Sequence, residues 1–501
     1  MRPKSSLLLI FVMVISIHSF TQETFSKVFF HQTDGIQVTA LSQSADSNYV
    51  MVGFETVSYW EYMTGLVVKF DKQGNTIWSK ILVSPIDYTI FTDIIPCSDS
   101  GFIILGQNES NIILMKMNQQ GDIVWAKKSD WEIRNLQARA ICPTFGKGFA
   151  IVGNYNELPI DTPYFTFVST FDESGNSLWT DTFGLTEANS IVQLPDSTLL
   201  ITGDYTQSYL MNLQDDGSVN WYKNIFPDSY HSYALEISGE SIYSLFSLDN
   251  DILGLRKLDF EFNQQWFLQI DLESGNFWNN YLQPKMISTP DSGIIIVNQK
   301  ADASGNLLKI TKDGTISWAK ELVFMGADAA IIGDSAYMIV GNGISWPVAI
   351  TRTDLNGNGS DCISDINVTS QFLSDTMIPD FASVSHQYDS FVDFTPVFNN
   401  LQLTEQQGCV LDFIREDEPK GNLKILPNPA NESFKVEVEK IKYDNFKQLE
   451  ISDLSGRLVF QTTDQNLLKE GIHTSQFLPG VYQVVLLTKY ERYITKLMIV
   501  R

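Results

Sequence analysis

The stretch KFDKQGNTIWSK at residues 69–80 decides the fold, because its pattern occurs six times in the chain. Each copy places two short alternating segments around a polar turn, and the second segment contains a tryptophan. The other copies are KMNQQGDIVWAK (116–127), TFDESGNSLWTD (170–181), NLQDDGSVNWYK (212–223), KLDFEFNQQWFL (257–268) and KITKDGTISWAK (309–320). Alternation of apolar and polar residues favours β-strands, and a turn glycine supplies the positive φ that a tight turn requires. The sequence therefore predicts six β-hairpins of one kind.

The spacing of the copies points to one architecture. Their tryptophans lie 47, 54, 42, 45 and 52 residues apart, and blades of β-propellers have about this length. A second hairpin precedes the first and is marked by turns such as Asp99-Ser100-Gly101 and Asp291-Ser292-Gly293. Two hairpins per repeat predict a four-stranded blade. Equivalent residues in six repeats are better explained by packing between blades than by ligand binding, so we expect a structural role for Trp78, Trp125, Trp179, Trp221, Trp266 and Trp318.

The seventh repeat lacks its last strand. Residues 334–341 and 348–358 supply three strands and the turn, but no tryptophan strand follows them. Residues 24–29 read like the tryptophan strand at 77–82, with Phe25 in the tryptophan position. We therefore expect the N-terminal strand to complete the seventh blade, since closure protects strand edges that an open array would expose. The predicted fold is all-β, with a seven-bladed β-propeller over residues 22–362.

Charge separates the chain into two compositions. The chain has 59 acidic and 34 basic residues, a formal charge of −25, and such a balance disfavours binding to nucleic acid or anionic membranes. The last 79 residues carry 11 basic and 9 acidic residues, a net charge of +2. We interpret residues 423–501 as a separate module.

The N-terminus has the pattern of a secretory signal peptide. Arg2 and Lys4 precede an apolar run over residues 7–17, and polar residues follow. We expect residues 1–21 to be removed by cleavage near Thr21. The alternative is a membrane anchor, but an apolar run this short does not reach the roughly 20 residues that span a bilayer. No later stretch has 18 uninterrupted apolar residues, so we expect no transmembrane helix in the mature protein.

The four cysteines suggest disulfides in an exported protein. Cys97 and Cys142 lie at similar places in consecutive repeats, and Cys362 and Cys409 bracket the segment that follows the repeats. We predict the pairs Cys97–Cys142 and Cys362–Cys409, with free buried thiols as the alternative. Residues 363–422 show no repeat and end in the charged stretch REDEPKG (415–421). We therefore expect them to form a connecting segment and linker.

The C-terminal module carries four short motifs. They are P-N-P at 427–429, D-x-x-G-R at 453–457, L-x-G-x-Y at 478–482, and a basic, apolar end at 496–501. Short alternating strands between them suggest a small immunoglobulin-like β-sandwich. The matching residues are Pro427, Asn428, Pro429, Asp453, Gly456, Arg457, Gly480, Tyr482 and Lys496.

These motifs resemble the type A sorting domain of the type IX secretion system. The resemblance implies export across the inner membrane and capture of this domain by the outer-membrane secretion machinery. It also implies removal by a sortase-like protease, with attachment to the cell surface or release outside the cell. The alternative is an ordinary immunoglobulin-like adhesion domain, because a fold alone does not determine a role. The propeller region resembles the tryptophan-docking repeats of pyrroloquinoline-quinone-type propellers and the propeller repeats of secreted Bacteroidetes surface proteins.

The sequence contains no recognisable catalytic motif. It lacks H-E-x-x-H, G-x-S-x-G, P-loop and dinucleotide patterns. The expected tunnel of the propeller would be lined from the starts of the inner strands, where repeat alignment places Gln37, Thr92, Arg139, Asn189, Tyr233, Lys285 and Ala329. One weak calcium candidate matches D-x-N-x-N-G with an acid at the twelfth position. Its oxygen ligands would be Asp354, Asn356, Asn358 and Asp365.

Three functions compete on these observations. We expect a secreted or surface propeller without catalytic activity that binds a protein or a glycan, with no cofactor apart from the calcium candidate. The alternative is a secreted hydrolase or lyase that degrades polysaccharide. Glycoside hydrolysis would need two carboxylates about 5 to 10 Å apart. A quinone-dependent dehydrogenase is disfavoured, because that resemblance is confined to the docking turn.

Overall fold

The computed structural model divides the chain into two compact units, residues 1–411 and 412–501. Both are built of antiparallel strands, and the described part has one α-helix, α1 (Asn466–Glu470), and one 3-10 helix, η3 (Thr474–Gln476). No helix in the part that the structure describes is long and apolar enough to cross a membrane. The structure describes residues 24–500 except 32–34, 58–61, 84–87, 109–110, 132–134, 157–163, 185–186, 205–207, 227–230, 250–251, 273–282, 301–303, 334, 344–346, 361, 375–377, 381–383, 388–390, 409–422, 439–445, 454–457 and 489–491. The predicted signal peptide lies outside these residues.

The first unit contains seven five-stranded sheets among its described residues. Sheet 1 contains β2 (Gly35–Gln43), β3 (Tyr49–Val57), β4 (Tyr62–Phe70), β5 (Thr76–Leu82) and β34 (Phe398–Asn400). Sheet 2 contains β6 (Ile90–Pro96), β7 (Phe102–Gln107), β8 (Ile112–Met117), β9 (Ile123–Ser129) and β33 (Phe391–Asp393). Sheet 3 contains β10 (Gln137–Pro143), β11 (Phe149–Asn156), β12 (Tyr164–Phe171), β13 (Ser177–Phe183) and β32 (Val384–Gln387).

The remaining sheets follow the same order. Sheet 4 contains β14 (Glu187–Gln193), β15 (Leu199–Asp204), β16 (Ser208–Leu213), β17 (Val219–Phe226) and β31 (Ile378–Asp380). Sheet 5 contains β18 (Ser232–Ser238), β19 (Ser241–Asp249), β20 (Ile252–Leu258), β21 (Gln264–Asp271) and β30 (Thr369–Phe372). Sheet 6 contains β22 (Lys285–Ser288), β23 (Ile294–Gln299), β24 (Gly305–Ile310), β25 (Ile316–Leu322) and β29 (Ile363–Asp365). Sheet 7 contains β26 (Met325–Ile332), β27 (Ala336–Asn342), β28 (Val348–Asp354), β1 (Phe25–Phe30) and β35 (Thr404–Gln407).

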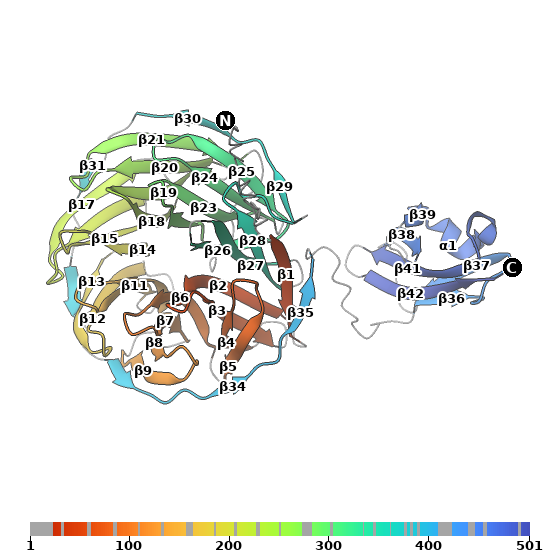
Figure 1. The fold of residues 1–501 in the computed structure, drawn as a ribbon, viewed down its shortest axis with the longest axis horizontal. Coiled ribbons are helices and arrows are strands. Elements are labelled where there is room, and N and C mark those ends of the chain that lie inside the picture. The colour runs from red at the N-terminus through yellow and green to blue at the C-terminus, as the bar shows by residue number, and fades with distance from the viewer. Residues whose placement is uncertain are drawn as a thin grey trace, which may run out of the picture. The chain divides into compact units, whose positions relative to one another are not determined.

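The sheets form a closed ring around a central axis, the arrangement of a β-propeller (Figure 1). The first strand of each sheet contacts the first strand of the next sheet, and β26 of sheet 7 contacts β2 of sheet 1. The ring closes as the sequence predicted, because β1 pairs antiparallel with β28, with Phe25 opposite Arg352. A strand from the N-terminal end therefore completes the last repeat.

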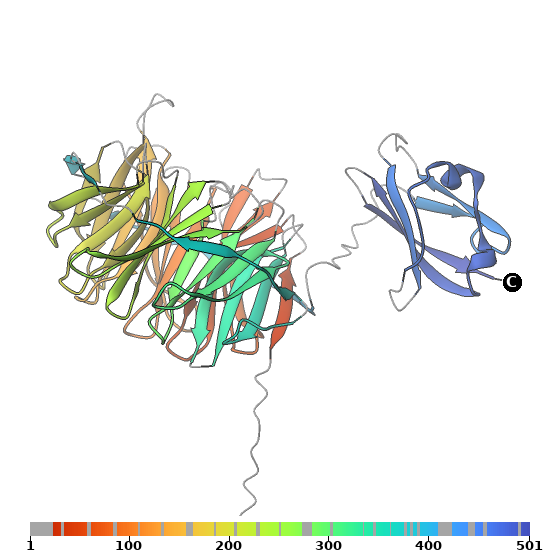
Figure 2. The same ribbon diagram turned by 90° about the horizontal axis from the view of Figure 1, so that it is seen from above.

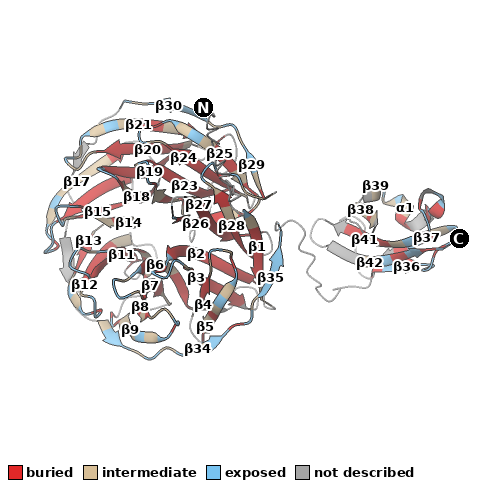
Figure 3. Cartoon of the chain, viewed as in Figure 1, coloured by how far each residue is buried: buried red, intermediate tan, exposed pale blue. Residues whose placement is uncertain are grey.

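Apolar clusters between neighbouring sheets hold the ring together. Between sheets 2 and 3, for example, Ile103 and Leu105 pack against Phe149 and Ile151, all at most 4% exposed. The middle strands are buried on both faces, which is why they read as nearly continuous apolar runs. Figure 3 shows this burial running through the middle of each sheet.

The repeat tryptophans lie between consecutive sheets. The Trp78 indole N–H donates to the Gln119 carbonyl in the turn of sheet 2, at 3.1 Å. The ring of Trp78 also covers Gly121 of that turn, where an added Cβ would lie 3.0 Å from the indole. Phe25 covers Gly74 of sheet 1 in the same way, at 2.6 Å from such a Cβ. Phe25 thus occupies the tryptophan position that the repeat alignment gave it.

The repeated turn has a clear physical basis. Asp71 Oδ1 accepts the backbone N–H groups of Gln73 and Asn75, at 2.8 and 2.9 Å. Gly74 between them has a φ of 72°, a conformation that glycine adopts without steric cost. These hydrogen bonds explain why acid, glycine and amide recur together in the repeat.

Residues 363–407 form an unexpected element, which we call the girdle. Its seven short strands, β29 to β35, pair one after another with the outer edges of sheets 6, 5, 4, 3, 2, 1 and 7. Figures 1 and 2 show the girdle running around the outside of the ring. We had expected residues 363–422 to connect two domains, but 363–407 belong to the propeller. The girdle was not recognised in the sequence because its strands are only three or four residues long. In addition, the side chains of β29, β30, β33, β34 and β35 are mostly exposed and leave no apolar pattern.

The predicted pair Cys97–Cys142 is wrong. Both residues are free thiols, and they lie on opposite sides of sheet 3. Cys97 packs against the cluster between sheets 2 and 3, whereas Cys142 belongs to the cluster between sheets 3 and 4. Burial raises the pKa of Cys142 to about 12. The pair Cys362–Cys409 stays a prediction, because Cys409 lies outside the described residues.

The second unit contains two antiparallel sheets that share one core. The smaller sheet contains β36 (Leu423–Leu426), β37 (Ser433–Val438) and β40 (Ile472–His473). The larger sheet contains β39 (Leu458–Thr462), β38 (Phe446–Asp453), β41 (Gly480–Thr488) and β42 (Arg492–Ile499). Phe434 from the smaller sheet and Ile451 and Val484 from the larger sheet are fully buried in this core.

Candidate functional site

The inner strands of the ring enclose a cavity of 450 Å³. Six of the seven sheets interrupt the pairing of their first two strands by a register shift among the described residues. A shift of this kind leaves one residue unpaired and redirects its side chain. In five of these sheets the unpaired residue lines the cavity, and these residues are Thr39, Thr92, Arg139, Asn189 and Tyr233.

Most of the positions predicted to line the tunnel do so. Thr92, Arg139, Asn189, Tyr233, Lys285 and Ala329 all line the cavity. Gln37 does not line the cavity and is 1% exposed. The register shift in sheet 1 leaves Thr39 unpaired, and Thr39 lines the cavity in its place. Repeat alignment thus predicted the cavity-lining position of each sheet to within two residues.

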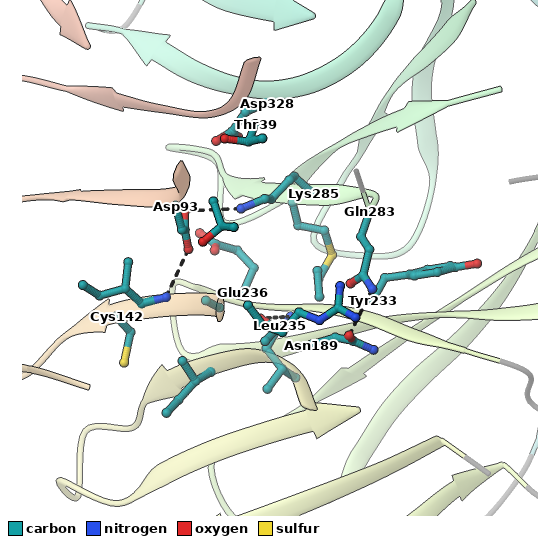
Figure 4. A pocket seen from close by; sticks show the side chains of 18 of the residues that line it. Thr39, Asp93, Cys142, Asn189, Tyr233, Leu235, Glu236, Gln283, Lys285 and Asp328 are labelled. Atoms are coloured by element: carbon teal, nitrogen blue, oxygen red, sulfur yellow. Dashed lines mark hydrogen bonds and ion pairs between the residues drawn. The ribbon is translucent and has the colours of Figure 1, made fainter. Parts of the chain in front are cut away.

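Three acids that repeat alignment missed line this cavity together with the predicted Lys285 as a charged cluster. Lys285 reaches across from sheet 6 to sheet 2, where its Nζ lies 3.3 Å from Asp93 Oδ1 (Figure 4). Glu236 of sheet 5 and Asp328 of sheet 7 also line the cavity. Each of these acids lies in an otherwise largely apolar inner strand. A lone acid in such a strand was the sequence feature that could have indicated the cluster.

The cluster shifts the titration of its own members. Burial raises the pKa of Glu236 to about 7 and that of Asp328 to about 6. Burial alone would lower the pKa of Lys285, but the carboxylates of Asp93, Asp328 and Glu236 outweigh that effect and raise it. Lys285 is therefore a stable cation that partly compensates the buried Asp328 and the half-buried Asp93 and Glu236.

The same acids join neighbouring sheets. Asp93 Oδ2 accepts the backbone N–H of Ile141 at 3.1 Å, and Glu236 Oε1 accepts that of Ser288 at 2.9 Å. Asp328 Oδ2 accepts the backbone N–H of Leu41 at 2.9 Å. Each donor belongs to the next sheet around the ring, so these bonds fix the position of the acids. The cavity is consequently lined by charges whose positions the fold determines.

A second polar group lies beside the cavity at the starts of β14 and β18. Asn189 Nδ2 donates to Asp204 Oδ1 at 2.8 Å, and Gln283 Nε2 donates to Asn189 Oδ1 at 3.0 Å. The other carboxylate oxygen of Asp204 lies 3.0 Å from His231 Nδ1. This hydrogen bond raises the pKa of His231, whose side chain is 61% exposed.

Asp204 differs from the corresponding residues of sheets 3 and 7, which are amides. Asn154 accepts the Ala188 N–H of β14, and Asn342 accepts the Val38 N–H of β2, both at 2.7 Å. Asp204 makes the same contact to the Ser232 N–H at a longer 3.4 Å and adds the pair with His231. An amide at position 204 would be enough for the contact with the Ser232 N–H. The negative charge of Asp204 additionally orients His231 beside the cavity.

The calcium candidate lies in the docking turn of sheet 7. Asp354 Oδ1 accepts the backbone N–H groups of Asn356 and Asn358, both at 2.8 Å. The Lys320 ammonium donates to Asn358 Oδ1 and Asp365 Oδ1, at 2.8 and 2.6 Å. A bound cation would have to displace this ammonium. Calcium stays a prediction, and an unchanged melting temperature on addition of a chelator would contradict it.

Within the described residues, no group of three or more His, Cys, Asp or Glu side chains is arranged to hold a metal ion. The cavity offers amide, hydroxyl, guanidinium, ammonium and carboxylate groups, with one tyrosine ring. Such groups can hydrogen-bond a polar ligand without a metal.

The sorting motifs meet in the second unit. The Asn428 side chain donates to the Lys496 carbonyl at 2.7 Å and accepts the Met498 N–H at 2.8 Å. The P-N-P segment, Pro427 to Pro429, thus binds the basic end of the unit. Tyr482 pairs with Asp453 across β38 and β41, and its hydroxyl donates to the Leu478 carbonyl at 2.6 Å. Gly480 begins β41, and Gly456 and Arg457 lie outside the described residues.

Comparison with known proteins identifies one region of the chain. The model of the secretion system C-terminal sorting domain matches residues 424–500. No curated protein matches the chain.

Several solved structures are similar to the propeller part. The Dos1 propeller is 11% identical with a TM-score of 0.41, over 68% of this chain and 97% of that one. A catalytically inactive virginiamycin B lyase from Staphylococcus aureus, with quinupristin, is 8% identical with a TM-score of 0.44, over 66% and 100%. A Bacteroides caccae protein of unknown function is 11% identical with a TM-score of 0.33, over 50% and 88%.

The fold and the matched domain together define the class of protein. The first unit is a ring of antiparallel sheets, and residues 424–500 carry the sorting signal of type IX secretion. The chain is a β-propeller protein with a type IX secretion sorting domain, exported to the cell surface or the extracellular space.

Proposed function

We propose that this protein is a seven-bladed propeller without catalytic activity that binds a glycan in its central cavity. The observation that carries the proposal is the set of polar side chains, contributed by different sheets, that converge on one cavity of 450 Å³. Cavities of about 300 to 1,000 Å³ accommodate small ligands. A cavity of this size and polarity suits a short, hydroxylated ligand.

The chemistry of the lining supports a glycan. Sugar hydroxyls both donate and accept hydrogen bonds, and Gln283 and Arg139 line the cavity with an amide and a guanidinium group. Tyr233 adds an aromatic ring beside these groups, and such a ring can cover the apolar face of a sugar. A protein ligand would reach the same groups only through a protruding loop.

Binding to a panel of oligosaccharides tests this proposal. The wild-type propeller should bind at least one glycan, and Arg139→Ala should weaken that binding at least tenfold. Gln371→Ala, on the exposed girdle, is the matched control and should bind as the wild type does. Binding of a protein and of no glycan would mean that the ligand is a protein. Unchanged glycan binding by Arg139→Ala would mean that the cavity is not the binding site.

A second candidate function is cleavage of a polysaccharide. The pair of His231 and Asp204 favours it, since a histidine oriented by a carboxylate can act as a general base. Glu187 lies opposite Asp204 in the register of β14 and β15, and burial together with Asp204 raises its pKa. Release of shortened or unsaturated products from a glycan panel, abolished in His231→Gln, would favour this function over simple binding.

We also propose that the second unit is an immunoglobulin-like sandwich removed by a sortase-like protease at the outer membrane. The contact between Asn428 and the end of β42 supports a role for residues 496–501 in forming the sorted domain. Deletion of residues 496–501 should leave the protein in the periplasm. Surface delivery of that truncated protein would contradict the proposal.

A further inference from the structure

The girdle begins and ends at the same point of the ring. Its first strand, β29, pairs with sheet 6, and its last strand, β35, pairs with β1 of sheet 7. Both ends contact Ser26 of β1. The Ser26 hydroxyl contacts the hydroxyl of Ser360, just before the girdle. The Ser26 carbonyl accepts the backbone N–H of Gly408, just after it, at 3.1 Å. The girdle therefore makes one complete circuit.

The two remaining cysteines follow these contact residues closely in the sequence. Cys362 follows Ser360 by two residues, and Cys409 follows Gly408 directly. Consecutive Cα atoms are about 3.8 Å apart, so each cysteine follows a residue in contact with Ser26 by no more than about 8 Å of chain. A disulfide requires Cα atoms about 4.4 to 6.8 Å apart, which such short segments can bring about. Cys362 is 1% exposed, and its carbonyl accepts the Val323 N–H at 3.1 Å, which fixes it against sheet 6. The other two cysteines are free thiols elsewhere in the ring.

We propose that Cys362 and Cys409 form a disulfide that joins the two ends of the girdle, so that a covalent loop encircles the propeller. In forming it, the two thiols lose two protons and two electrons and one S–S bond is made. A disulfide-bearing oxidant of the thiol–disulfide exchange type accepts them and is reduced to two thiols. The oxidising environment of an exported protein supplies such oxidants.

The loop changes how the girdle can detach. A strand of three or four residues is held by few hydrogen bonds, and short edge segments open locally with little cost. An open girdle could therefore peel from either end, one strand at a time. A closed girdle has no free end, and detaching one strand requires slack from the others. The disulfide thus protects all seven outer edges together, independently of any ligand in the cavity.

Alkylation of the full-length protein tests the pairing. The protein is denatured and alkylated with and without prior reduction, and its mass is measured. Two cysteines, Cys97 and Cys142, should react without reduction, and four should react after it. Alkylation of four cysteines without reduction, or a cross-linked peptide that contains Cys97 or Cys142, would overturn the proposal.

Cleavage of the girdle tests the closed loop itself. In a Cys97→Ser, Cys142→Ser background, a site for a specific protease is inserted after Pro396, next to the 58% exposed Val397. After cleavage and denaturation, the two fragments should stay linked until reductant is added. Their separation without reductant contradicts the loop. The same protein with Cys362→Ser is the control and should separate under both conditions.

The melting temperature gives a readout that does not require the inserted site. Reductant should lower the melting temperature of the Cys97→Ser, Cys142→Ser protein and leave that of the Cys362→Ser, Cys409→Ser protein unchanged. An equal shift in both proteins would contradict a stabilising closure.

Discussion

The inner and outer edges of the seven sheets are stabilised in different ways. At the outer edge the girdle pairs with all seven sheets through backbone hydrogen bonds. The side chains of β29, β30, β33, β34 and β35 are mostly exposed. At the inner edge the residue at the register shift differs from sheet to sheet, from Thr92 to Arg139 to Tyr233. Backbone pairing makes few demands on sequence. Backbone pairing at the outer edge is therefore repeated from sheet to sheet, whereas the side chains at the inner edge differ, and there we place the proposed ligand site.

Removal of the girdle should have the largest effect. Replacing residues 363–407 by a short Gly/Ser linker exposes seven strand edges and removes buried apolar side chains such as that of Leu401, which is 8% exposed and packs in the core between sheets 7 and 1. Burial of each large apolar side chain contributes about 1.5 to 3 kcal/mol, so the melting temperature should fall by at least about 10 °C. Open edges should also promote association.

Calorimetry and light scattering measure these two effects. The exposed substitution Thr369→Ala in the girdle is the control and should leave both unchanged. A monomeric girdle-free protein with a wild-type melting temperature would show that the outer edge needs no cover.

A substitution at a docking turn should have the next largest effect. Gly121 has a φ of 77°, and an added Cβ would lie 3.0 Å from the Trp78 ring. Gly121→Val combines this crowding with a backbone conformation that β-branched residues avoid. The free energy of unfolding should fall by about 2 to 4 kcal/mol, as measured by denaturant titration.

Gly146 provides the matched control for this prediction. Nothing lies within 4 Å of a Cβ added there, and its φ is not in the left-handed range. Gly146→Val should therefore change stability by less than about 0.5 kcal/mol. Equal effects at the two glycines would mean that the tryptophan contact between sheets does not stabilise the ring.

The charged cluster should give the inner edge a pH dependence. The pKa of Glu236 is about 7 in the folded protein against 4.5 for the free side chain, because burial disfavours its charged form. The protonated form is thus favoured by folding, so its stabilisation is complete below pH 4.5 and is lost as the pH rises to about 7. Lys285 and Asp328 face this carboxyl group.

Denaturant titrations between pH 4 and 8 should show this loss. Glu236→Gln keeps an acceptor for the Ser288 N–H and should flatten the decline. The exposed Glu173→Gln is the control and should keep the wild-type slope. A slope that Glu236→Gln leaves unchanged would contradict the account of the cluster.

Thr92→Ala should have the smallest effect on stability. Thr92 lines the cavity, and its hydroxyl donates only a 3.4 Å hydrogen bond to the Leu105 carbonyl. The free energy of unfolding should change by less than about 0.5 kcal/mol. A loss above 1.5 kcal/mol in denaturant titration would mean that the inner edge is structural too.

The repeat pattern made much of the propeller predictable. Turn glycines such as Gly74 and tryptophans such as Trp78 recur because every sheet needs the same turn and the same contact with its neighbour. Closure by β1 was also predictable, because Phe25 packs over the turn glycine Gly74 as the repeat tryptophan Trp78 packs over Gly121. Features that each sheet must repeat leave a periodic signal in the sequence.

The girdle and the charged cluster left no such signal. A girdle strand forms by backbone pairing with the outer edge of a sheet, which the sequence of the strand alone does not reveal. Residues such as Thr369 to Phe372 show no alternation of buried and exposed side chains. Asp93, Glu236 and Asp328 come from different sheets, and only the closed ring brings them to Lys285. The pairing of Cys97 with Cys142 failed because similar positions in consecutive repeats can face opposite sides of one sheet.

Titration of a glycan into the wild-type, Arg139→Ala and Gln371→Ala proteins tests most directly the claim that ligand chemistry lies at the inner edge. The glycan is the tightest binder found in the oligosaccharide panel, and the readout is its dissociation constant by calorimetry. The account predicts that Arg139→Ala weakens binding at least tenfold while Gln371→Ala binds as the wild type does. Binding lost in Gln371→Ala but kept in Arg139→Ala, or no glycan bound at all, would contradict it.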